Sequence, residues 1–299
     1  SKAATKRLLA RLDKINPDVV HLHNLHGYYL NVEMLFEWLA EHDCKVEWTL
    51  HDCWAFTGHC AYFTYVKCAQ WKSHCAYAKP CQQLGTYPKT YSKASCSWNF
   101  EQKKRLFNLV PADRMKLIMP SQWLADLVGE SFLAKYPVEV RHNTIDTSVF
   151  KPTPSDFRER YGIGDRFMIL GVASPWTERK GLADFVRLAG ELDSGKYAVV
   201  LVGLSERQIK EFSEQLVALP KTESREKLVE AYSAADVFFN STVEDNYPTV
   251  NLEAEACGTP VVTYDTGGCR ETVKDDRSIV VEGYADAVRF LEALGGVKR

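Results

Sequence analysis

The chain has 299 residues, enough for two globular domains, and 45% of them are hydrophobic, enough to build two cores. Its formal net charge of -2 gives no overall attraction to nucleic acid, so we expect no nucleic-acid partner. No apolar run approaches the length of a transmembrane helix and no signal-peptide pattern opens the chain, so we expect a cytoplasmic protein, with contact to the inner face of the membrane left open.

In the first half, short apolar runs alternate with amphipathic segments. The expected strands share four to five mostly apolar residues: 19–22, 46–50, 115–119 and 138–141. The expected helices lie between or before them: 1–16, 32–41, 99–109 and 122–128. This βαβ alternation predicts a Rossmann-like parallel-sheet domain over residues 1–150.

Polar side chains follow the first two of these strands. Asn24 and His26 lie in the loop after the first strand, and His51 and Asp52 follow the second. Ligands of parallel sheets bind at the carboxyl ends of the strands, so these four residues are candidate site residues. The structural alternative for His51 is a histidine that only caps the sheet.

Residues 53–96 form a cysteine-rich insertion that holds six of the nine cysteines. Cys60, Cys68, Cys75 and Cys81 are spaced more loosely than the paired Cys-x2-Cys of zinc ribbons. The odd total argues against a complete disulfide framework. We expect a structural Zn²⁺ at these four cysteines in preference to disulfides, with reduced buried thiols as the third interpretation.

The helix expected at 99–109 is basic, with Lys103, Lys104 and Arg105 in succession. A solvated face is the default interpretation of such a run. Contact with an anionic lipid-linked acceptor or with a membrane surface is the alternative.

Residues 151–299 predict a second Rossmann-like domain, after a linker that contains Pro152 and Pro154. Its expected strands are buried apolar runs: 167–172, 197–203, 235–239 and 259–264. Its expected helices are 182–192, 205–219, 225–234, 249–256 and 285–294, with a further helix after Gly268.

The stretch EDNYPTVNLEAEACGTPVVTYDTGGCRE, residues 244–271, is the most informative part of this domain. Asp245 and Glu253 are separated by seven residues near the expected carboxyl edge of the sheet. A single carboxylate at a helix start commonly only compensates the helix dipole, whereas two at this spacing are a more specific sign of a ligand site. The Gly267-Gly268 turn can present backbone N–H groups to a phosphate.

These residues resemble the E-x7-E motif of retaining GT-B glycosyltransferases, most closely glycosyltransferase family 4 (group 1) of the polysaccharide-biosynthesis type. The loop Ala173–Gly181 resembles the family's diphosphate loop, although Ser174 stands where the family has an arginine. Residues 142–152 resemble its N-G-[IV]-D-x3-F-x-P segment, with Thr144 in place of glycine. The resemblance implies an α/β GT-B fold, with two Rossmann-like domains facing a cleft.

The resemblance also implies the reaction: transfer of a sugar from a UDP- or GDP-sugar to a hydroxyl of a glycan or lipid-linked acceptor. No catalytic metal is implied, and the setting is bacterial capsule or lipopolysaccharide synthesis by a hexosyltransferase. The first acid, Asp245 or the neighbouring Glu244, would hold the donor sugar, and Glu253 the ribose. Contact with the diphosphate is implied for Arg179, Lys180, Gly267 and Gly268. On the acceptor side, His51 would orient the reacting hydroxyls, beside Asn24, His26 and Asp52.

Family members begin with one or two further βαβ units that carry a Gly-rich turn, and this sequence shows none. We therefore expect a chain that starts inside its first domain, which leaves open whether it is catalytically active. Trp54, Tyr62, Tyr65 and Trp71 suit stacking on sugars or a small core of the insertion. The alternatives to a transferase are a GT-B sugar-nucleotide epimerase or phosphorylase, and a non-catalytic zinc-stabilised binding module.

Overall fold

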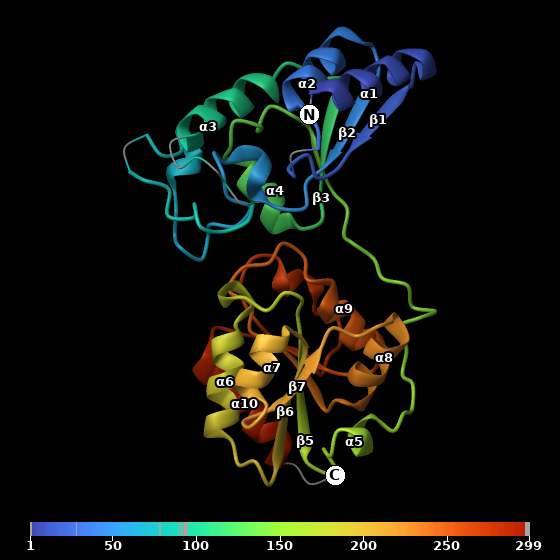
Figure 1. Cartoon of the computed structure of the whole chain (residues 1–299), viewed down its shortest axis with the longest axis vertical. Coiled ribbons are helices and arrows are strands. Elements are labelled where there is room, and N and C mark those ends of the chain that lie inside the picture. Colours follow the sequence, from blue (N-terminus) through green and yellow to red (C-terminus); the bar gives the residue numbers. More distant parts are fainter. Residues whose placement is uncertain are drawn as a thin grey trace. The chain divides into compact units, whose positions relative to one another are not determined.

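The computed structural model describes residues 2–27, 29–77, 79–88, 90, 92 and 95–296. By its internal contacts the chain divides into two compact units, Ser1–His142 and Asn143–Arg299 (Figure 1). Each unit contains one parallel β-sheet. Within the described residues, no helix combines the length and the apolar character needed to cross a bilayer.

Unit 1 contains a four-stranded parallel sheet in the order β1-β2-β3-β4. Its strands are β1 (Val19–Leu22), β2 (Lys45–Thr49), β3 (Met115–Met119) and β4 (Val138–Val140). Its helices are α1 (Lys2–Ile15), α2 (Val32–Glu41), α3 (Ser95–Leu106) and α4 (Gln122–Gly129). Side-chain caps fix two helix starts, since Asn31 accepts from the N–H of Met34 and Ser121 from that of Leu124. The predicted βαβ alternation is confirmed.

The cysteine-rich insertion contributes directly to the core of unit 1. Phe56 and Trp71 are buried, with ring centroids 5.3 Å apart, and Phe63 lies 5.2 Å from Trp71. These side chains belong to the same apolar cluster as the sheet residue Trp48. For Trp71 the structure therefore favours the core over a sugar-stacking surface.

Lys103 of α3 is buried, at 6% exposure, so the expectation of a solvated basic face is wrong at this position. Its Nζ donates to the carbonyl oxygens of Trp54, at 2.7 Å, and Thr57, at 2.9 Å. It also lies 3.6 Å from the centroid of the Trp54 ring. These contacts replace water around the amine, while Lys104 and Arg105 are exposed as expected.

Unit 2 contains a six-stranded parallel sheet in the order β10-β9-β8-β5-β6-β7. Its strands are β5 (Phe167–Val172), β6 (Tyr197–Leu204), β7 (Val217–Pro220), β8 (Val237–Asn240), β9 (Val261–Tyr264) and β10 (Ile279–Val281). Its helices are α5 (Phe157–Arg160), α6 (Leu182–Glu191), α7 (Glu206–Phe212), α8 (Arg225–Ala234), α9 (Thr249–Ala256) and α10 (Tyr284–Gly296).

The helices of unit 2 cover both faces of its sheet. One apolar core joins the sheet to α6, α7 and α10, and a second joins it to α5, α8 and α9 (Figure 1). Because both faces are covered, the central strands are apolar along their whole length, as in Met168–Gly171 and Ala198–Leu204. This is the doubly wound arrangement that the sequence predicted.

Two local predictions for unit 2 are wrong, and one edge strand was missed. The helix expected at 205–219 ends at Phe212, and Val217–Pro220 forms strand β7, because this short apolar run pairs with the edge of β6. Pro220 is tolerated there because β7 is an edge strand. The helix expected after Gly268 is a single 3₁₀ turn, Cys269–Thr272, and the other edge strand, β10, was not expected.

Gly181, at the start of α6, offers a test of this packing. Its φ is +73°, and a Cβ there would lie 2.1 Å from Ser241 Oγ and 2.3 Å from Ser241 O. We expect Gly181→Ala to destabilise unit 2 by about 2 kcal/mol or more, since a left-handed conformation alone costs about 1–2 kcal/mol. Gly190→Ala in the same helix is the control, because its Cβ would meet no atom within 4 Å. It should instead stabilise by about 0.5–1 kcal/mol. Amide hydrogen exchange of peptides from unit 2 measures both, and equal protection in the two variants would contradict this account.

Candidate active site

Two cations and a carboxylate meet at the carboxyl edge of the sheet in unit 2. Arg179 and Lys180 end the loop after β5, and Asp245 lies in the loop after β8. Lys180 Nζ forms an ion pair with Asp245 Oδ2, and Arg179 Nη1 lies 3.7 Å from the same oxygen. Arg179 Nη1 also donates to the carbonyl oxygen of Glu244 at 2.5 Å. Residues 65 positions apart in the chain are thus joined at one point.

Backbone contacts hold these two loops together. The N–H of Val243 donates to the carbonyl oxygen of Arg179 at 2.9 Å, and the Thr242 hydroxyl donates to the same oxygen at 3.1 Å. The hydroxyl of Ser241 donates to the carbonyl oxygen of Gly181 at 3.1 Å. The cations therefore sit on a backbone that is tied to the end of β8, independent of their own ion pairs.

The Gly267-Gly268 turn packs on the backbone of Asp245. Gly267 has φ +57°, and a Cβ there would lie 2.0 Å from the Asp245 carbonyl oxygen, so only glycine fits. The N–H of Gly268 donates to that oxygen at 2.9 Å. This N–H, which we expected to be free for a phosphate, is therefore engaged within the protein.

The two neighbouring acids, Glu244 and Asp245, lie in different environments. The Asp245 carboxylate lies beside Arg179 and Lys180, and its side chain is 14% exposed. Glu244 is fully buried, at 0% exposure. Of the two, Asp245 is the acid that the loop presents to the cations.

Glu253 lies on α9, and its Oε2 accepts a hydrogen bond from the Tyr232 hydroxyl at 3.0 Å. Burial raises the pKa of this carboxyl, and the hydrogen bond from Tyr232 opposes that rise. A buried polar chain fixes the start of the same helix. Asn240 donates to Asn251 at 2.9 Å, and Asn251 donates to the Thr272 hydroxyl at 2.8 Å. These two hydrogen bonds were not predicted, because amides within apolar runs follow no motif.

In unit 1 the candidate histidines form two pairs. His51 Nε2 lies 2.9 Å from His23 Nδ1. His26 Nε2 lies 3.1 Å from Asp52 Oδ2, so two residues that were predicted from separate loops are brought together. The Tyr87 hydroxyl lies 2.9 Å from His26 Nδ1 and completes a Tyr–His–Asp chain. Tyr87 was missed because it is 61 residues from His26.

Asn24 is exposed in the same loop, and its backbone carbonyl accepts from the Tyr29 hydroxyl at 2.6 Å. Asp52 is further fixed by the N–H of Trp54, which donates to Oδ1 at 2.9 Å. Both carboxylate oxygens of Asp52 therefore accept hydrogen bonds within unit 1. This arrangement can hold His26 in one orientation.

All nine cysteines are free thiols. The thiols of Cys60 and Cys96 donate to the sulfur of Cys81, which lowers the pKa of Cys81 and raises the other two. Cys75 and Cys96 also approach each other, since a Cβ on Gly58 would lie 2.8 Å from Cys75 Cβ and 2.8 Å from Cys96 Sγ. Over the described ranges, no three His, Cys, Asp or Glu side chains are arranged to hold a metal ion. The thiols as placed thus do not form the ligand set predicted for zinc.

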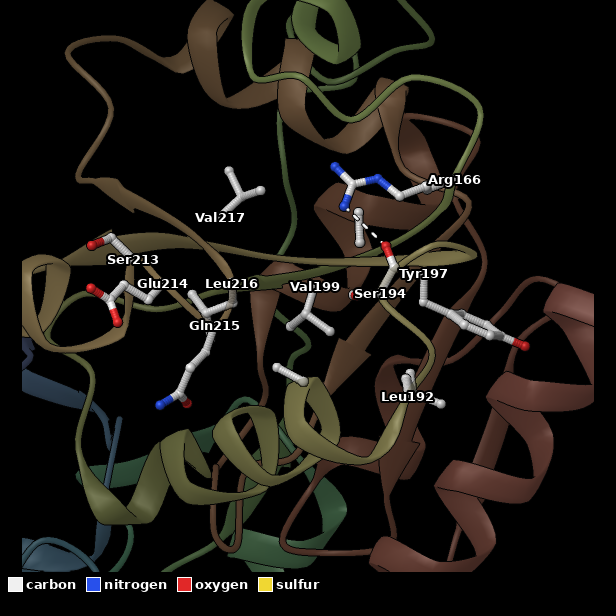
Figure 2. A pocket seen from close by; sticks show the side chains of 12 residues that line it. Arg166, Leu192, Ser194, Tyr197, Val199, Ser213, Glu214, Gln215, Leu216 and Val217 are labelled. Carbon is white, nitrogen blue, oxygen red and sulfur yellow. Dashed lines mark hydrogen bonds between the residues drawn. The ribbon is translucent and has the colours of Figure 1, made fainter.

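Figure 2 shows a separate hollow of about 240 Å³ in unit 2, lined by Arg166, Ser194, Tyr197 and Val217 among others. Its walls come from the amino ends of β5, β6 and β7. Ligands of parallel sheets bind at the carboxyl ends, so this hollow lies at the wrong edge for the site described above.

Comparison with known proteins gives a family match within unit 2 and a likeness of fold over both units. Residues 155–294 match the family Glycosyl transferases group 1. The chain is 14% identical to Anabaena Alr3699/HepE in complex with UDP, with a TM-score of 0.64, covering 96% of this chain and 72% of that one. It is 16% identical to sucrose-phosphate synthase from Thermosynechococcus elongatus, with a TM-score of 0.69, covering 98% and 70%. These likenesses establish a GT-B-like fold with two Rossmann-like domains.

Among proteins of similar sequence is the putative colanic acid biosynthesis glycosyl transferase WcaC of Escherichia coli K12. It is 27% identical over 273 residues, which cover 86% of this chain and 62% of that protein. The D-inositol 3-phosphate glycosyltransferase of Xylanimonas cellulosilytica is 30% identical over 172 residues, 51% of this chain and 41% of that protein. The similarity to the Glycosyl transferases group 1 family thus lies in unit 2, and this chain spans less than two thirds of the length of both relatives.

The His23–His51 pair predicts a pH dependence of stability. Burial and then the charge of His23 lower the pKa of His51, and burial and then the charge of His21 lower that of His23. Folded unit 1 therefore binds fewer protons here than the unfolded chain does, so stability is lost as the pH falls below about 6.5.

We expect the urea midpoint of unit 1 to fall between about pH 7.5 and pH 5.5, and His51→Gln to reduce that fall. Hydrogen exchange of unit 1 peptides in urea at each pH measures the midpoint. His142→Gln, outside this cluster, is the control. If His51→Gln showed the full wild-type fall, the pair would not titrate as described.

Proposed function

We propose that this chain is a retaining glycosyltransferase. It would move a sugar from a UDP- or GDP-sugar to a hydroxyl of a glycan or lipid-linked acceptor, in the synthesis of a bacterial surface polysaccharide at the cytoplasmic side. The observation that carries the proposal is the convergence of Arg179 and Lys180 on Asp245 at the carboxyl edge of the sheet in unit 2.

The physical reason lies in the charge that develops during the reaction. When the bond between the sugar C1 and the diphosphate breaks, the leaving diphosphate gains negative charge. Fixed cations at the start of α6 stabilise that charge without reorganisation. The acceptor oxygen bonds to C1 on the same face, and its proton passes to the departing diphosphate oxygen. Asp245 would hold the sugar hydroxyls, and Glu253 the ribose.

The relatives support a nucleotide-sugar donor and leave the base open. Structures of HepE contain UDP and UDP-glucose. One sequence relative is a GDP-mannose-dependent mannosyltransferase of Mycolicibacterium smegmatis, 30% identical over 50% of this chain. The name of the Escherichia coli relative refers to colanic acid biosynthesis, and that of a Streptococcus pneumoniae relative to a diacylglycerol glycolipid. Both kinds of acceptor therefore enter the proposal.

On the acceptor side, we propose that His51 orients the reacting hydroxyl and that His26, Asp52 and Asn24 line the acceptor path. The support is local: His26 is fixed by hydrogen bonds from both sides, and His51 is bonded to His23. A neutral imidazole held in one orientation can accept a hydroxyl proton in a hydrogen bond.

Calorimetric titration of the full chain with UDP and with GDP tests the donor site. We expect one nucleotide to bind and Lys180→Ala to weaken it about 10- to 100-fold, since a hydrogen bond to a charged group contributes about 1.5–3 kcal/mol. Glu253→Ala should weaken it about tenfold or more through loss of the ribose contact. The matched controls are Lys196→Ala, exposed at the amino end of β6, and Glu292→Ala, exposed on α10.

If neither nucleotide binds the wild type, or if the control variants lose as much affinity as Lys180→Ala and Glu253→Ala, the donor site is not where we place it.

A second experiment separates the enzyme classes: the chain is incubated with the sugar donor of whichever nucleotide it binds. A transferase requires an acceptor, whereas an epimerase releases the nucleotide diphosphate and an epimeric sugar without one.

The structural Zn²⁺ at Cys60, Cys68, Cys75 and Cys81 stays a prediction. Metal analysis of the purified full chain by plasma mass spectrometry tests it: about one equivalent of zinc, lost in Cys81→Ser, is the expected result. Cys257→Ser, in unit 2, is the control. A wild-type chain with less than about a tenth of an equivalent would contradict the prediction and leave the free thiols of the structure as the native state.

A further inference from the structure

Unit 1 contains a cavity of about 340 Å³ that shares His26 with the acceptor-side residues described above. Its walls come from the loop before α2, the start of α2, the segment after β2, and α3. The volume is at the low end of the range for small-molecule sites, about 300–1,000 Å³. It has room for one hexose ring.

Two indole rings line this cavity. Trp98 of α3 is 64% exposed, which is unusual for so large an apolar side chain. Trp54 is half-buried, and Lys103 lies against its ring. A flat apolar ring with an exposed face suits a ligand that offers a face of C–H groups with polar groups at its rim.

Polar groups with spare hydrogen-bonding capacity lie beside these rings. Asn99 and Gln102 line the cavity from α3. Among the described residues, the Asn99 amide has no hydrogen-bond partner. Gln102 uses its Oε1 to accept from Arg105 Nη2 at 3.0 Å, which leaves its NH₂ group to donate. His26, held by Asp52 and Tyr87, is part of the same lining.

The charges around the cavity are compensated within the protein. Lys103 donates to two carbonyl oxygens, and burial lowers its pKa to about 7. Glu33 is paired with Arg105 at 2.8 Å. A charged ligand would meet no unpaired partner among these groups. An alkyl chain would cover the amides of Asn99 and Gln102 without giving them partners, which is costly because water is displaced from them. A neutral ligand with many hydroxyl groups fits both conditions.

We propose that this cavity binds one neutral pyranose ring of the acceptor, stacked on Trp98 and hydrogen-bonded by Asn99 and Gln102. That the ring belongs to the acceptor rests on the proposed function, whereas the binding of a neutral sugar rests on the cavity alone. Both ring nitrogens of His26 are engaged by Asp52 and Tyr87, so His26 would contribute to the choice of sugar by shape, as a fixed part of the cavity wall.

Saturation-transfer NMR on the full chain tests the proposal with the methyl glycosides of glucose, galactose, mannose, fucose and N-acetylglucosamine. We expect at least one glycoside to give a transfer signal, and Trp98→Ala to reduce that signal at least fivefold. Asn99→Ala, a milder change, should reduce it about threefold or more. Tyr77→Ala is the control, because Tyr77 is 81% exposed and lies outside the cavity lining. Hydrogen exchange confirms that each variant is folded.

The failures of this inference and of the proposed function are distinguishable. No signal from any glycoside, in a chain that binds UDP or GDP, overturns the cavity proposal and leaves the transferase proposal in place. A glycoside signal that Trp98→Ala abolishes, in a chain that binds no nucleotide, supports a sugar site and counts against the transferase. Equal loss in Trp98→Ala and Tyr77→Ala overturns the cavity as the binding place. The same NMR measurement is repeated with detergent micelles that carry dodecyl chains. A saturation-transfer signal from the dodecyl chains, without a signal from any glycoside, overturns the proposal of a sugar and indicates a lipid.

Discussion

The close packing of backbone that brings Lys180 and Arg179 to Asp245 is the constraint on which the candidate donor site depends. Three segments meet there: the end of the β5–α6 loop, the loop after β8, and the turn at Gly267-Gly268. Gly181 and Gly267 both have positive φ, and each lies against a neighbouring backbone where a Cβ would clash. The charges are therefore placed by steric constraints on glycine, which do not depend on whether a ligand is bound.

In unit 1 the candidate site residues are held differently, because polar side chains fix one another through hydrogen bonds. His26 is held between Asp52 and Tyr87, and His51 is bonded to His23. Both ring nitrogens of His26 and the Nε2 of His51 are committed to these hydrogen bonds, so the tautomer and the orientation of each ring are linked. Burial disfavours the charged imidazole of His51, which favours a neutral base at neutral pH. Both arrangements give a fixed geometry at the ends of parallel strands.

The sequence predicted the central strands and the helices beside them because their signals are local. The strand after Ala235, Pro248 before α9 and Gly258 after it mark one βαβ unit within 30 residues, and the structure has these elements. The edge strand β7 was missed because its apolar run continues the pattern expected for a helix over 205–219, and β10 was missed because its three residues follow a charged stretch, residues 274–277. Lys103 and Tyr87 were misjudged or missed for a different reason. Their partners, Trp54 and His26, are 49 and 61 residues away, and no local pattern reports such a contact.

The same distinction explains why the sequence predicts the candidate site of unit 2 more completely than that of unit 1. In unit 2 the motif residues are themselves the charged groups, so sequence and geometry point to the same atoms. In unit 1 the groups that would recognise a ligand, such as Trp98 and Asn99, follow no motif and acquire a common environment only when α3 packs beside the loop before α2. Donor recognition acts on a diphosphate, whose charge requires fixed cations. Acceptor recognition acts on hydroxyls, which aromatic faces and amides can bind in many arrangements, so it leaves a weaker trace in the sequence and depends more on the fold.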